Sequence, residues 1–407
     1  MYTFGIFLYI AFVRIAAFFG HRKACSMLKG HKEVFGVLEK RVVPGNDYVW
    51  FHVSSLGRFE QSRPLIEKLR AKHPELRVVL TFFSPSGYNI AKNYQLADVV
   101  CYLPFDTKRN VKRFLDVLNP KMAFFVKSEF WLNFLLGLKK RNVPVYSISS
   151  QFRKNQVFFR PWGGYGRLAL HSFDHLFVQD AKSKELLLSI GVDKVTVTGD
   201  TRFDRVMKIA EKARQLPLVD AFVDGDSKVF VIGSSWDDDE AVYMPFFNRH
   251  KEWKLIVVSH EIDDDRIRKI ESQYDGVCVR YSKATIENVR KARCLIIDCY
   301  GLLSALYGYG AMAYVGGGFG RGVHNVLEAA VYGIPVFFGP HNHRSQAAQE
   351  LKSCGGAIEI ASTIGFEEKV GIFANNAAAL ARASKAAGSY VKDKSGVTDK
   401  IFNAIGL

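Results

Sequence analysis

Residues 315–330 read VGGGFGRGVHNVLEAA, and this stretch decides the fold expected for the C-terminal half of the chain. An apolar run that ends in glycines is typical of a strand whose carboxyl end enters a tight loop, and the pattern predicts a helix that begins near His324. Glycines let a phosphate approach the backbone closely, and a helix N-terminus offers free N–H groups. The stretch lacks the ending of a Walker loop and the spacing of a dinucleotide fingerprint. It therefore indicates another kind of nucleotide-phosphate loop.

Strand and helix patterns alternate on both sides of this stretch. Apolar runs predict strands at residues 48–53, 76–83, 99–103, 122–127, 143–148, 175–179, 228–232, 254–258, 276–279, 294–298, 311–315 and 335–338. Helical patterns separate most of these runs, and such alternation predicts mostly parallel sheets covered on both faces. The pattern restarts near residue 205. We therefore predict two doubly wound α/β domains, residues 23–205 and 206–407, that face each other across a cleft.

Polar residues directly after the predicted strands are the candidate site residues, because ligands of such sheets bind beyond the carboxyl ends of the strands. In the C-terminal half, Gly233-Ser234-Ser235 and His260 occupy such positions. The acidic runs 237–240 and 263–265 beside them fit first turns of helices, with an oxygen-ligand metal site as the alternative. In the N-terminal half, the loops 54–61 and 127–131 could each present a glutamate as a general base, or merely a helix-start acid.

The first twenty residues are apolar and aromatic apart from Arg14, and basic residues follow them. As a helix the segment would be roughly 30 Å long, about the thickness of the hydrocarbon core of a membrane. We predict a membrane anchor at residues 1–22, with the rest of the chain on the cytoplasmic side. Because a charge inside the bilayer is costly, an interfacial helix is one alternative and a buried helix is another.

The 407 residues carry a net charge of +16, which predicts an acidic partner. Nucleic acid, anionic lipids and phosphorylated substrates all have the required charge. No basic stripe with interleaved aromatic residues appears beyond the segment that follows the anchor, and this argues against nucleic acid. Anionic lipids and phosphorylated substrates are therefore the partners that we expect.

The motifs that carry a family resemblance extend over almost the whole chain. They are residues 52–64, 84–87, 102–106, 128–131, 199–204, 233–235, 316–330 and 339–341, together with the apolar N-terminus. With these residues the chain resembles the bacterial Kdo transferases, where Kdo is 3-deoxy-D-manno-octulosonic acid. The resemblance implies an inverting glycosyltransferase of the two-domain GT-B type, with neither a metal nor another cofactor. It implies transfer of Kdo from CMP-Kdo to a lipid A precursor, lipid IVA, at the cytoplasmic face of the inner membrane.

The same resemblance implies which residues form the site. The N-terminal domain would bind the acceptor through Ser54, Ser55, Gly57 and Arg58. The C-terminal domain would bind the donor through Gly233, Ser234, Ser235, His260, Gly317, Gly318, Gly322, His324, Asn325 and Glu328. The last helix of the chain is free to pack back on the N-terminal domain.

One position departs from the family pattern. The family's base is a Glu directly after the Gly of a Ser-x-Gly-Glu loop, and here that position holds Arg58. Glu60 is the candidate base in its place and Glu129 is the second candidate, although two residues on a helix are about 200° apart. Three interpretations stay open: one of these glutamates replaces the base, the chain is a weakly active or non-catalytic membrane-bound member, or Arg58 is a sequence change in an ordinary enzyme. A GT-B transferase that uses a UDP-sugar is a further alternative.

Overall fold

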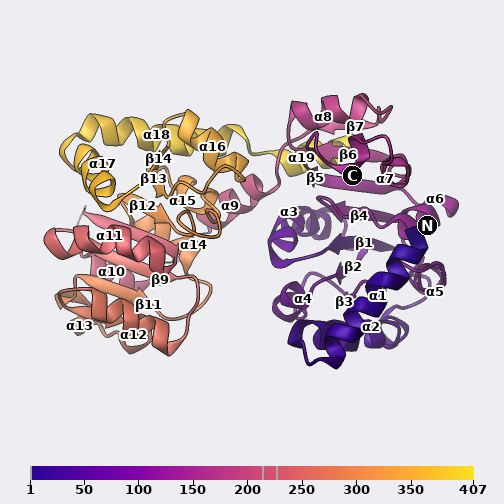
Figure 1. Cartoon of the computed structure of the whole chain (residues 1–407), viewed down its shortest axis with the longest axis horizontal. Helices are drawn as coiled ribbons and strands as arrows, with labels where there is room; N and C mark the ends of the chain where they lie inside the picture. Colours follow the sequence, from indigo (N-terminus) through magenta and orange to yellow (C-terminus); the bar gives the residue numbers. More distant parts are fainter. Residues whose placement is uncertain (1, 213–214, 226–227) are drawn as a thin grey trace. The chain divides into compact units, whose positions relative to one another are not determined.

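Two parallel sheets form the framework of the computed structural model, which describes residues 2–212, 215–225 and 228–407. Met1 of the predicted anchor lies outside the described residues. The chain divides into a first unit, Met1–Arg205 with Gly396–Leu407, and a second unit, Val206–Ser395. Each unit is one sheet covered by helices, as Figure 1 shows. The predicted fold class, two Rossmann-like α/β domains, is confirmed at this level.

The first unit has a seven-stranded sheet in the order β3-β2-β1-β4-β5-β6-β7. Its strands are β1 (Tyr48–Val53), β2 (Arg77–Phe82), β3 (Val99–Tyr102), β4 (Met122–Val126), β5 (Val145–Ser150), β6 (His175–Val178) and β7 (Val195–Val197). Its helices are α1 (Tyr2–Phe18), α2 (Arg22–Arg41), α3 (Leu56–Lys72), α4 (Pro85–Ala91), α5 (Lys108–Leu118), α6 (Leu132–Lys140), α7 (Gly164–Leu170), α8 (Ala181–Leu188) and α19 (Val397–Ile405). The helix α9 (Arg202–Glu211) begins in this unit and continues into the second.

The second unit has a seven-stranded sheet in the order β10-β11-β9-β8-β12-β13-β14. Its strands are β8 (Val229–Ser235), β9 (Lys254–Ser259), β10 (Cys278–Arg280), β11 (Cys294–Ile297), β12 (Met312–Val315), β13 (Val336–Phe338) and β14 (Ala357–Glu359). Its helices are α10 (Pro217–Val223), α11 (Asp237–Arg249), α12 (Asp264–Gln273), α13 (Ile286–Lys291), α14 (Leu303–Leu306), α15 (Leu327–Ala330), α16 (Gln346–Ser353), α17 (Thr363–Asn375) and α18 (Ala377–Asp393).

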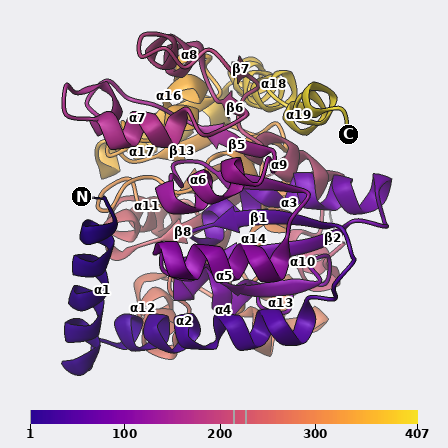
Figure 2. The same cartoon turned by 90° about the vertical axis from the view of Figure 1, so that its right-hand side faces the viewer.

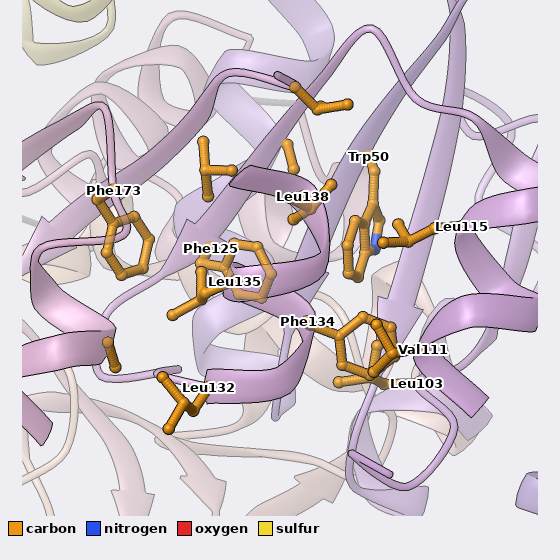
Figure 3. Close-up of a cluster of buried hydrophobic side chains, with 14 of the residues drawn as sticks. Trp50, Leu103, Val111, Leu115, Phe125, Leu132, Phe134, Leu135, Leu138 and Phe173 are labelled. Carbon is orange, nitrogen blue, oxygen red and sulfur yellow. The ribbon is translucent and has the colours of Figure 1, made fainter. Parts of the chain in front are cut away.

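The central strands are apolar because helices cover both of their faces. All six residues of β1 are buried, and Trp50 faces the opposite side of the sheet from Phe51. Figure 3 shows Trp50 packed with Phe125 of β4 and with Phe134 and Leu135 of α6. Burying a side chain of this size stabilises the fold by about 1.5–3 kcal/mol. This packing fixes the ends of β1 and β4, from which the loops of the candidate site emerge.

The N-terminal helix α1 packs on α2 at the margin of the first unit, as Figure 2 shows. Val13 is buried against α2, and the Tyr2 hydroxyl donates to the buried Asp106 at 2.6 Å. The other side of the segment exposes its large apolar side chains, which are Phe4, Phe7, Leu8, Phe12, Ile15, Phe18 and Phe19.

None of the helices in the described ranges is both long enough and apolar enough to cross a membrane. The predicted spanning form of the anchor at residues 1–22 is therefore not supported. Two features of the segment argue against a spanning helix. The helix α1 ends at Phe18 and is followed by a turn, and one of its faces packs on α2.

Asp204 fixes the last helix of the chain to the first unit. Its carboxylate accepts hydrogen bonds from the backbone N–H groups of Gly396, Val397 and Thr398, at 2.6–3.2 Å, and from the Thr398 hydroxyl. These are the free donors of the α19 N-terminus, which lacks a side-chain cap of its own.

Substituting Asp204→Ala removes all of these acceptors, and we expect it to destabilise the docking of α19 by about 0.5–2 kcal/mol. Hydrogen exchange of the α19 amides measures this change. Asp399→Asn is the matched control, because Asp399 lies on the same helix in an exposed ion pair with Lys68. Equal protection of α19 in wild type and Asp204→Ala would contradict the expectation.

Candidate active site

The first candidate site lies where the strand order of the first sheet reverses. β1 is hydrogen-bonded to β2 on one side and to β4 on the other. The strands β2 and β3 are added on one side of β1, and the strands from β4 onward are added on the other side, so the order of strand addition reverses between β1 and β4. Ligands of open parallel sheets bind beyond the carboxyl ends of the strands at such a switch point. The loops that begin at Ser54 and at Lys127 leave from these two ends.

An ion pair joins the two loops. The Arg58 guanidinium contacts the Glu129 carboxylate and also donates to the Ser54 hydroxyl. Glu129 is only 5% exposed, and its other oxygen accepts a hydrogen bond from the Trp131 indole at 2.9 Å. The structure therefore brings the predicted residues Ser54, Arg58 and Glu129 together.

His52, a buried residue of β1, is linked to this pair through the Trp131 indole. The Trp131 indole also donates to His52 Nε2 at 3.0 Å, so this nitrogen is an acceptor and the proton lies on Nδ1. Nδ1 then donates to the Thr81 hydroxyl oxygen at 2.9 Å, which also accepts from the Trp50 indole. Burial, followed by the charge of Arg58, lowers the pKa of His52 to about 3. The ring is thus neutral, and its 3.5 Å approach to Glu129 is not a charged pair.

Glu60 lies in a different set of contacts. The helix α3 begins at Leu56, inside the stretch 54–61 that the sequence pattern predicts as a loop, so Arg58 and Glu60 are both helical and point in different directions. Glu60 accepts from Arg205 at 2.7 Å and from Arg63 at 3.1 Å. Its carboxylate is therefore held by two arginines, away from the contacts of Arg58.

The remaining acceptor candidates, Ser55 and Gly57, lie at the start of α3. Ser55 is the N-cap residue and its hydroxyl makes no capping bond. A Cβ at Gly57 would meet nothing within 4 Å, so the backbone there faces open space. A substrate group can approach α3 at this point.

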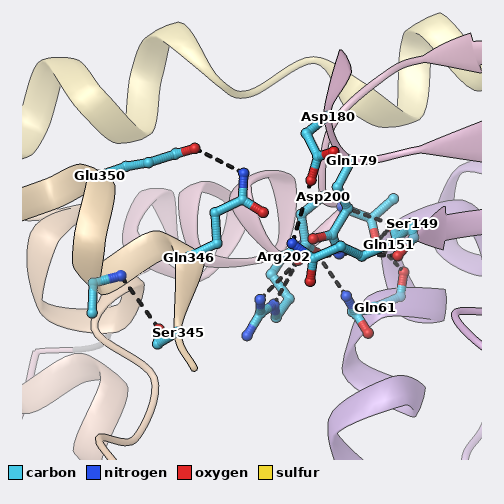
Figure 4. A network of polar contacts seen from close by, with 12 residues as sticks. Gln61, Ser149, Gln151, Gln179, Asp180, Asp200, Arg202, Ser345, Gln346 and Glu350 are labelled. Carbon is cyan, nitrogen blue, oxygen red and sulfur yellow. Dashed lines mark hydrogen bonds and ion pairs between the residues drawn. The ribbon is translucent and has the colours of Figure 1, made fainter. Parts of the chain in front are cut away.

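A buried carboxylate network, drawn in Figure 4, includes Gln61 of α3, the helix that also carries Arg58. Asp200 accepts from Gln61 at 2.7 Å, from Gln179 at 2.8 Å and from Arg202 at 2.8 Å. Burial acts to raise the pKa of Asp200, but the charges of Arg202 and Lys127 and the hydrogen bonds outweigh it and lower the pKa below its ordinary value. The network fixes the start of α9 against α3.

The second candidate site lies at the corresponding switch point, between β8 and β12. The glycines after β12 allow loops to pack on one another. A Cβ at Gly316 would lie 2.3 Å from the Ser234 carbonyl oxygen, and one at Gly318 would lie 2.5 Å from the Gly339 nitrogen. Gly317 and Gly322 have φ of 89° and 109°, which favours glycine.

The helix predicted to begin near His324 begins instead at Leu327, and α15 is only four residues long. Residues 322–326 are irregular because the His324 and Val323 N–H groups donate to the carbonyls of Gly316 and His341 rather than within a helix. Glu328 is paired inside the unit: it accepts from Asn325 at 2.9 Å and from the Ser304 hydroxyl at 2.7 Å.

Asp239 joins the two loops of the second site. This fully buried carboxylate accepts from the N–H groups of Gly317 and Trp236, at 2.8 and 3.0 Å, and from the Tyr314 hydroxyl at 2.8 Å. Burial raises its pKa, and the hydrogen bonds oppose this. Residues 237–240 form the first turn of α11. This agrees with their interpretation as acidic residues at the start of a helix.

A stack of planar side chains covers the same switch point. The rings of Trp236, His260 and His324 are stacked in series with centroids 4.5 and 4.4 Å apart, and the Trp236 indole donates to His324 Nε2 at 3.1 Å. The Arg321 guanidinium lies 4.4 Å from the Trp236 ring centre. Burial, then the His260 charge, lowers the pKa of His324 to about 4. The stack offers aromatic faces and one permanent positive charge to a nucleotide.

The remaining donor candidates of β8 differ in exposure. Gly233 lies within the sheet, where a Cβ would collide with the Tyr307 hydroxyl. The buried Ser235 hydroxyl donates to Glu240 at 3.1 Å. Ser234 is partly exposed at a left-handed φ of 55°. Of the three, Ser234 alone presents a hydroxyl outward.

Several residues of these sites were not among the sequence candidates, namely His52, Lys127, Trp131, Asp200, Arg202, Trp236 and Arg321. For His52 the sequence does carry a signal, because a histidine inside the apolar run YVWFHV must find partners once it is buried. The others lie within the quoted motifs or directly beside them. Their pairings join loops that are distant in sequence, which a linear pattern does not reveal.

Comparison with known proteins places these sites in a family context. Residues 29–205 match the family model for 3-deoxy-D-manno-octulosonic-acid transferase (kdotransferase). The chain is 29% identical over 329 residues to the 3-deoxy-D-manno-octulosonic acid transferase of Chlamydia muridarum, which covers 78% of this chain and 76% of that one. It is 27% identical over 319 residues to the enzyme of the same name from Aquifex aeolicus, with 77% and 82% covered.

Solved structures show the fold. A putative UDP-N-acetylglucosamine 2-epimerase from Listeria monocytogenes has a TM-score of 0.62 at 13% identity and covers 89% of this chain and 96% of its own. The UDP-GlcNAc 2-epimerase from Neisseria meningitidis has a TM-score of 0.60 at 16% identity, with 87% and 100% covered.

With its two Rossmann-like units and these relatives, the chain is a glycosyltransferase with a GT-B-like fold. Its relatives within that class are the Kdo transferases, and the resemblance predicted from the motifs is confirmed.

The role of Asp239 can be tested directly. In Asp239→Asn one acceptor oxygen becomes an NH₂ group that faces buried donors, so we expect a loss of about 1–3 kcal/mol in the stability of the second unit. Hydrogen exchange of the Gly317 amide, which donates to Asp239, should accelerate. Asp238→Asn, one exposed residue earlier on the same turn, should leave it unchanged. Equal exchange of the Gly317 amide in the two variants would argue against this role.

Proposed function

We propose that the chain transfers Kdo from CMP-Kdo to a lipid A precursor in lipopolysaccharide biosynthesis. The observation that carries the proposal is that the segment matched by the Kdo transferase model, residues 29–205, contains the switch-point loops and the buried Glu129. The similarity of the chain to curated Kdo transferases over about four fifths of its length supports the same activity.

For the donor, the proposal assigns CMP to the second switch point. The stacked rings of Trp236, His260 and His324 offer aromatic faces to the nucleotide, and Arg321 offers a charge to its phosphate. The partly exposed Ser234 and the backbone after β12 offer further hydrogen bonds. Asn325 and Glu328 belong to the same assignment because Asn325 fixes the orientation of the Glu328 carboxylate.

For the acceptor, the proposal assigns Glu129 as the carboxylate that accepts the proton of the attacking hydroxyl. Glu129 is buried at the carboxyl end of β4, and Trp131 and Arg58 hold its two oxygens. We favour it over Glu60, because Glu60 is paired with two arginines, Arg63 and Arg205, whereas Glu129 is paired with one. Ser54, Ser55 and Gly57 border the same loop and would position the acceptor sugar.

The bond changes follow from this assignment. An acceptor oxygen forms a bond to C2 of Kdo, and the bond from C2 to the CMP phosphate oxygen breaks. The hydroxyl proton passes to Glu129, and the electron pair of the broken bond leaves on CMP. Positive groups such as Arg321 stabilise the charge that develops on the phosphate. Because that charge can be balanced by side chains and N–H groups, the proposal includes no metal.

For localisation, the proposal is a membrane-surface contact by α1 on the cytoplasmic face of the inner membrane. The exposed side chains from Phe4 to Phe18 recur every three or four residues and form an apolar stripe. Arg14 and the lysines and arginines of α2 are exposed beside it. An apolar face flanked by cations is typical of a helix that lies in the interface of an anionic membrane.

The assignment of the base predicts a difference between two matched variants. With CMP-Kdo and a lipid A precursor, we expect Glu129→Gln to lower kcat about 10²–10⁴-fold, because an amide cannot accept the proton. Glu60→Gln should keep kcat near that of the wild type. CMP release measures turnover in both variants, and circular dichroism confirms that both remain folded.

Other outcomes of this assay would contradict the proposal. A large loss of kcat in Glu60→Gln alone would transfer the role of base to Glu60. Turnover that is absent in the wild type and appears in Arg58→Glu would show that the chain has lost its base. Release of UDP from a UDP-sugar in place of CMP would assign a different donor.

The membrane contact predicts a loss of lipid binding when the stripe is interrupted. We expect Phe12→Ser to weaken binding to vesicles that contain anionic lipid by about tenfold, because a phenylalanine leaves the lipid. Flotation of the full chain with such vesicles measures the change. Ile364→Ser, which replaces an equally exposed side chain on α17, is the control and should bind like the wild type. Equal loss in the two variants would argue against a specific role of α1.

A further inference from the structure

Lys127 holds a constrained position at the carboxyl end of β4. Its N–H group donates to the Ile148 carbonyl and its own carbonyl accepts from the Ser150 hydroxyl, both at 2.9 Å. Its φ of 61° lies in the left-handed region, which side chains disfavour. Backbone strain of this kind concentrates at functional sites. The two hydrogen bonds to β5 therefore stabilise Lys127 in a left-handed backbone conformation that is otherwise unfavourable.

Four cations gather around this position. Arg58 follows β1, Arg153 follows β5 and Arg202 begins α9, and all three act electrostatically on the Lys127 ammonium. Two carboxylates lie among them, but Glu129 pairs with Arg58 and Asp200 pairs with Arg202. The cluster thus carries two positive charges in excess.

These two charges belong to Lys127 and Arg153. Within the described ranges of the chain, neither the Lys127 ammonium nor the Arg153 guanidinium has a carboxylate within ion-pair distance. Burial lowers the pKa of Lys127 to about 8; Asp200 opposes this, and Arg202, Arg58 and Arg153 add to it. A partly desolvated ammonium without a counter-ion is unfavourable, and a bound anion would supply the missing charge.

We propose that Lys127 and Arg153 bind a phosphate group of the lipid acceptor, with Arg58 and Arg202 strengthening the positive potential of the site. A phosphate monoester fits because its oxygens can accept from an ammonium and a guanidinium at the same time. The identity of the ligand rests on the proposed function, in which the acceptor is a phosphorylated lipid A precursor. The oxyanion site itself rests only on the excess positive charge and on the burial of Lys127, since Arg153 is exposed. The carboxylate of the transferred sugar acid is the other oxyanion that the tests distinguish.

The first test needs no catalysis. The lysines of the full chain are converted to ¹³C-dimethyl-lysine, and the Lys127 signal is assigned as the one missing from Lys127→Met. Saturating inorganic phosphate should raise the pKa of Lys127 by about one unit, because a nearby anion favours the charged form. Lys121, at the opposite end of β4 in an ion pair with Asp47, is the control and should not move. An unchanged Lys127 signal would overturn the site.

The second test identifies the source of the phosphate. Losing one charge-assisted contact should raise the acceptor KM of Lys127→Met about 10- to 100-fold and leave the donor KM unchanged. With a dephosphorylated acceptor, Lys127→Met and the wild type should have the same KM. Lys121→Met should match the wild type throughout.

The outcomes separate this inference from the proposed function. An increase confined to the donor KM would overturn the acceptor phosphate in favour of the sugar-acid carboxylate. Unchanged KM values for both substrates would overturn the inference while Kdo transfer stood. A phosphate-dependent shift of Lys127 in a chain that transfers no Kdo would overturn the proposed function and support the oxyanion site.

Discussion

Burial of both faces of the central strands is the constraint on which the first site depends. A polar group inside β1 must find a partner within the protein, and His52 finds Thr81 on one side and the Trp131 indole on the other. The same Trp131 indole also donates to one oxygen of Glu129, and the second oxygen of Glu129 contacts Arg58. The position of the candidate base is thus fixed by a chain of hydrogen bonds that starts in the core. If Glu129 moved away, the partly buried Trp131 indole would keep only its hydrogen bond to His52.

In the second site, the loops are fixed by close backbone packing and by a buried carboxylate, and not by a chain of side-chain hydrogen bonds. Its loops are held by direct backbone packing, since Gly316 and Gly318 leave no room for a side chain against the neighbouring loops. The buried Asp239 carboxylate accepts hydrogen bonds from donors on both sides of the switch point. The glycines that sequence analysis assigned to phosphate approach therefore also have a structural task. That loop packing explains how His324 stacks on the His260 ring and accepts from the Trp236 indole without lying in a helix.

Sequence patterns predict what is continuous along the chain and miss what is formed between distant segments. β1 was predicted to the residue because its whole length is buried, whereas the three-residue edge strand β7 was missed because two of its residues are exposed. Residues 54–61 were predicted as a loop although α3 begins at Leu56, because the apolar pattern begins only after the first turn of this helix. The approach of Arg58 to Glu129 spans about seventy residues of sequence, and local periodicity contains no information about it. Motif resemblance identified both positions but not their contact.

Arg58 changes the electrostatics of the first site more than it changes its shape. A carboxylate at position 58 would face Glu129, and two adjacent carboxylates cannot both stay ionised, so one would hold a proton. With arginine, the site keeps one ionised carboxylate, and its net charge is one unit more positive than that of two carboxylates sharing a proton. Glu129 can accept a proton only to the extent that Arg58 releases it. An anion bound beside Lys127 gives Arg58 a second partner and so weakens its hold on Glu129. If the acceptor phosphate binds beside Lys127 as proposed, acceptor binding and the freeing of Glu129 as the proposed base are coupled through the Arg58 guanidinium.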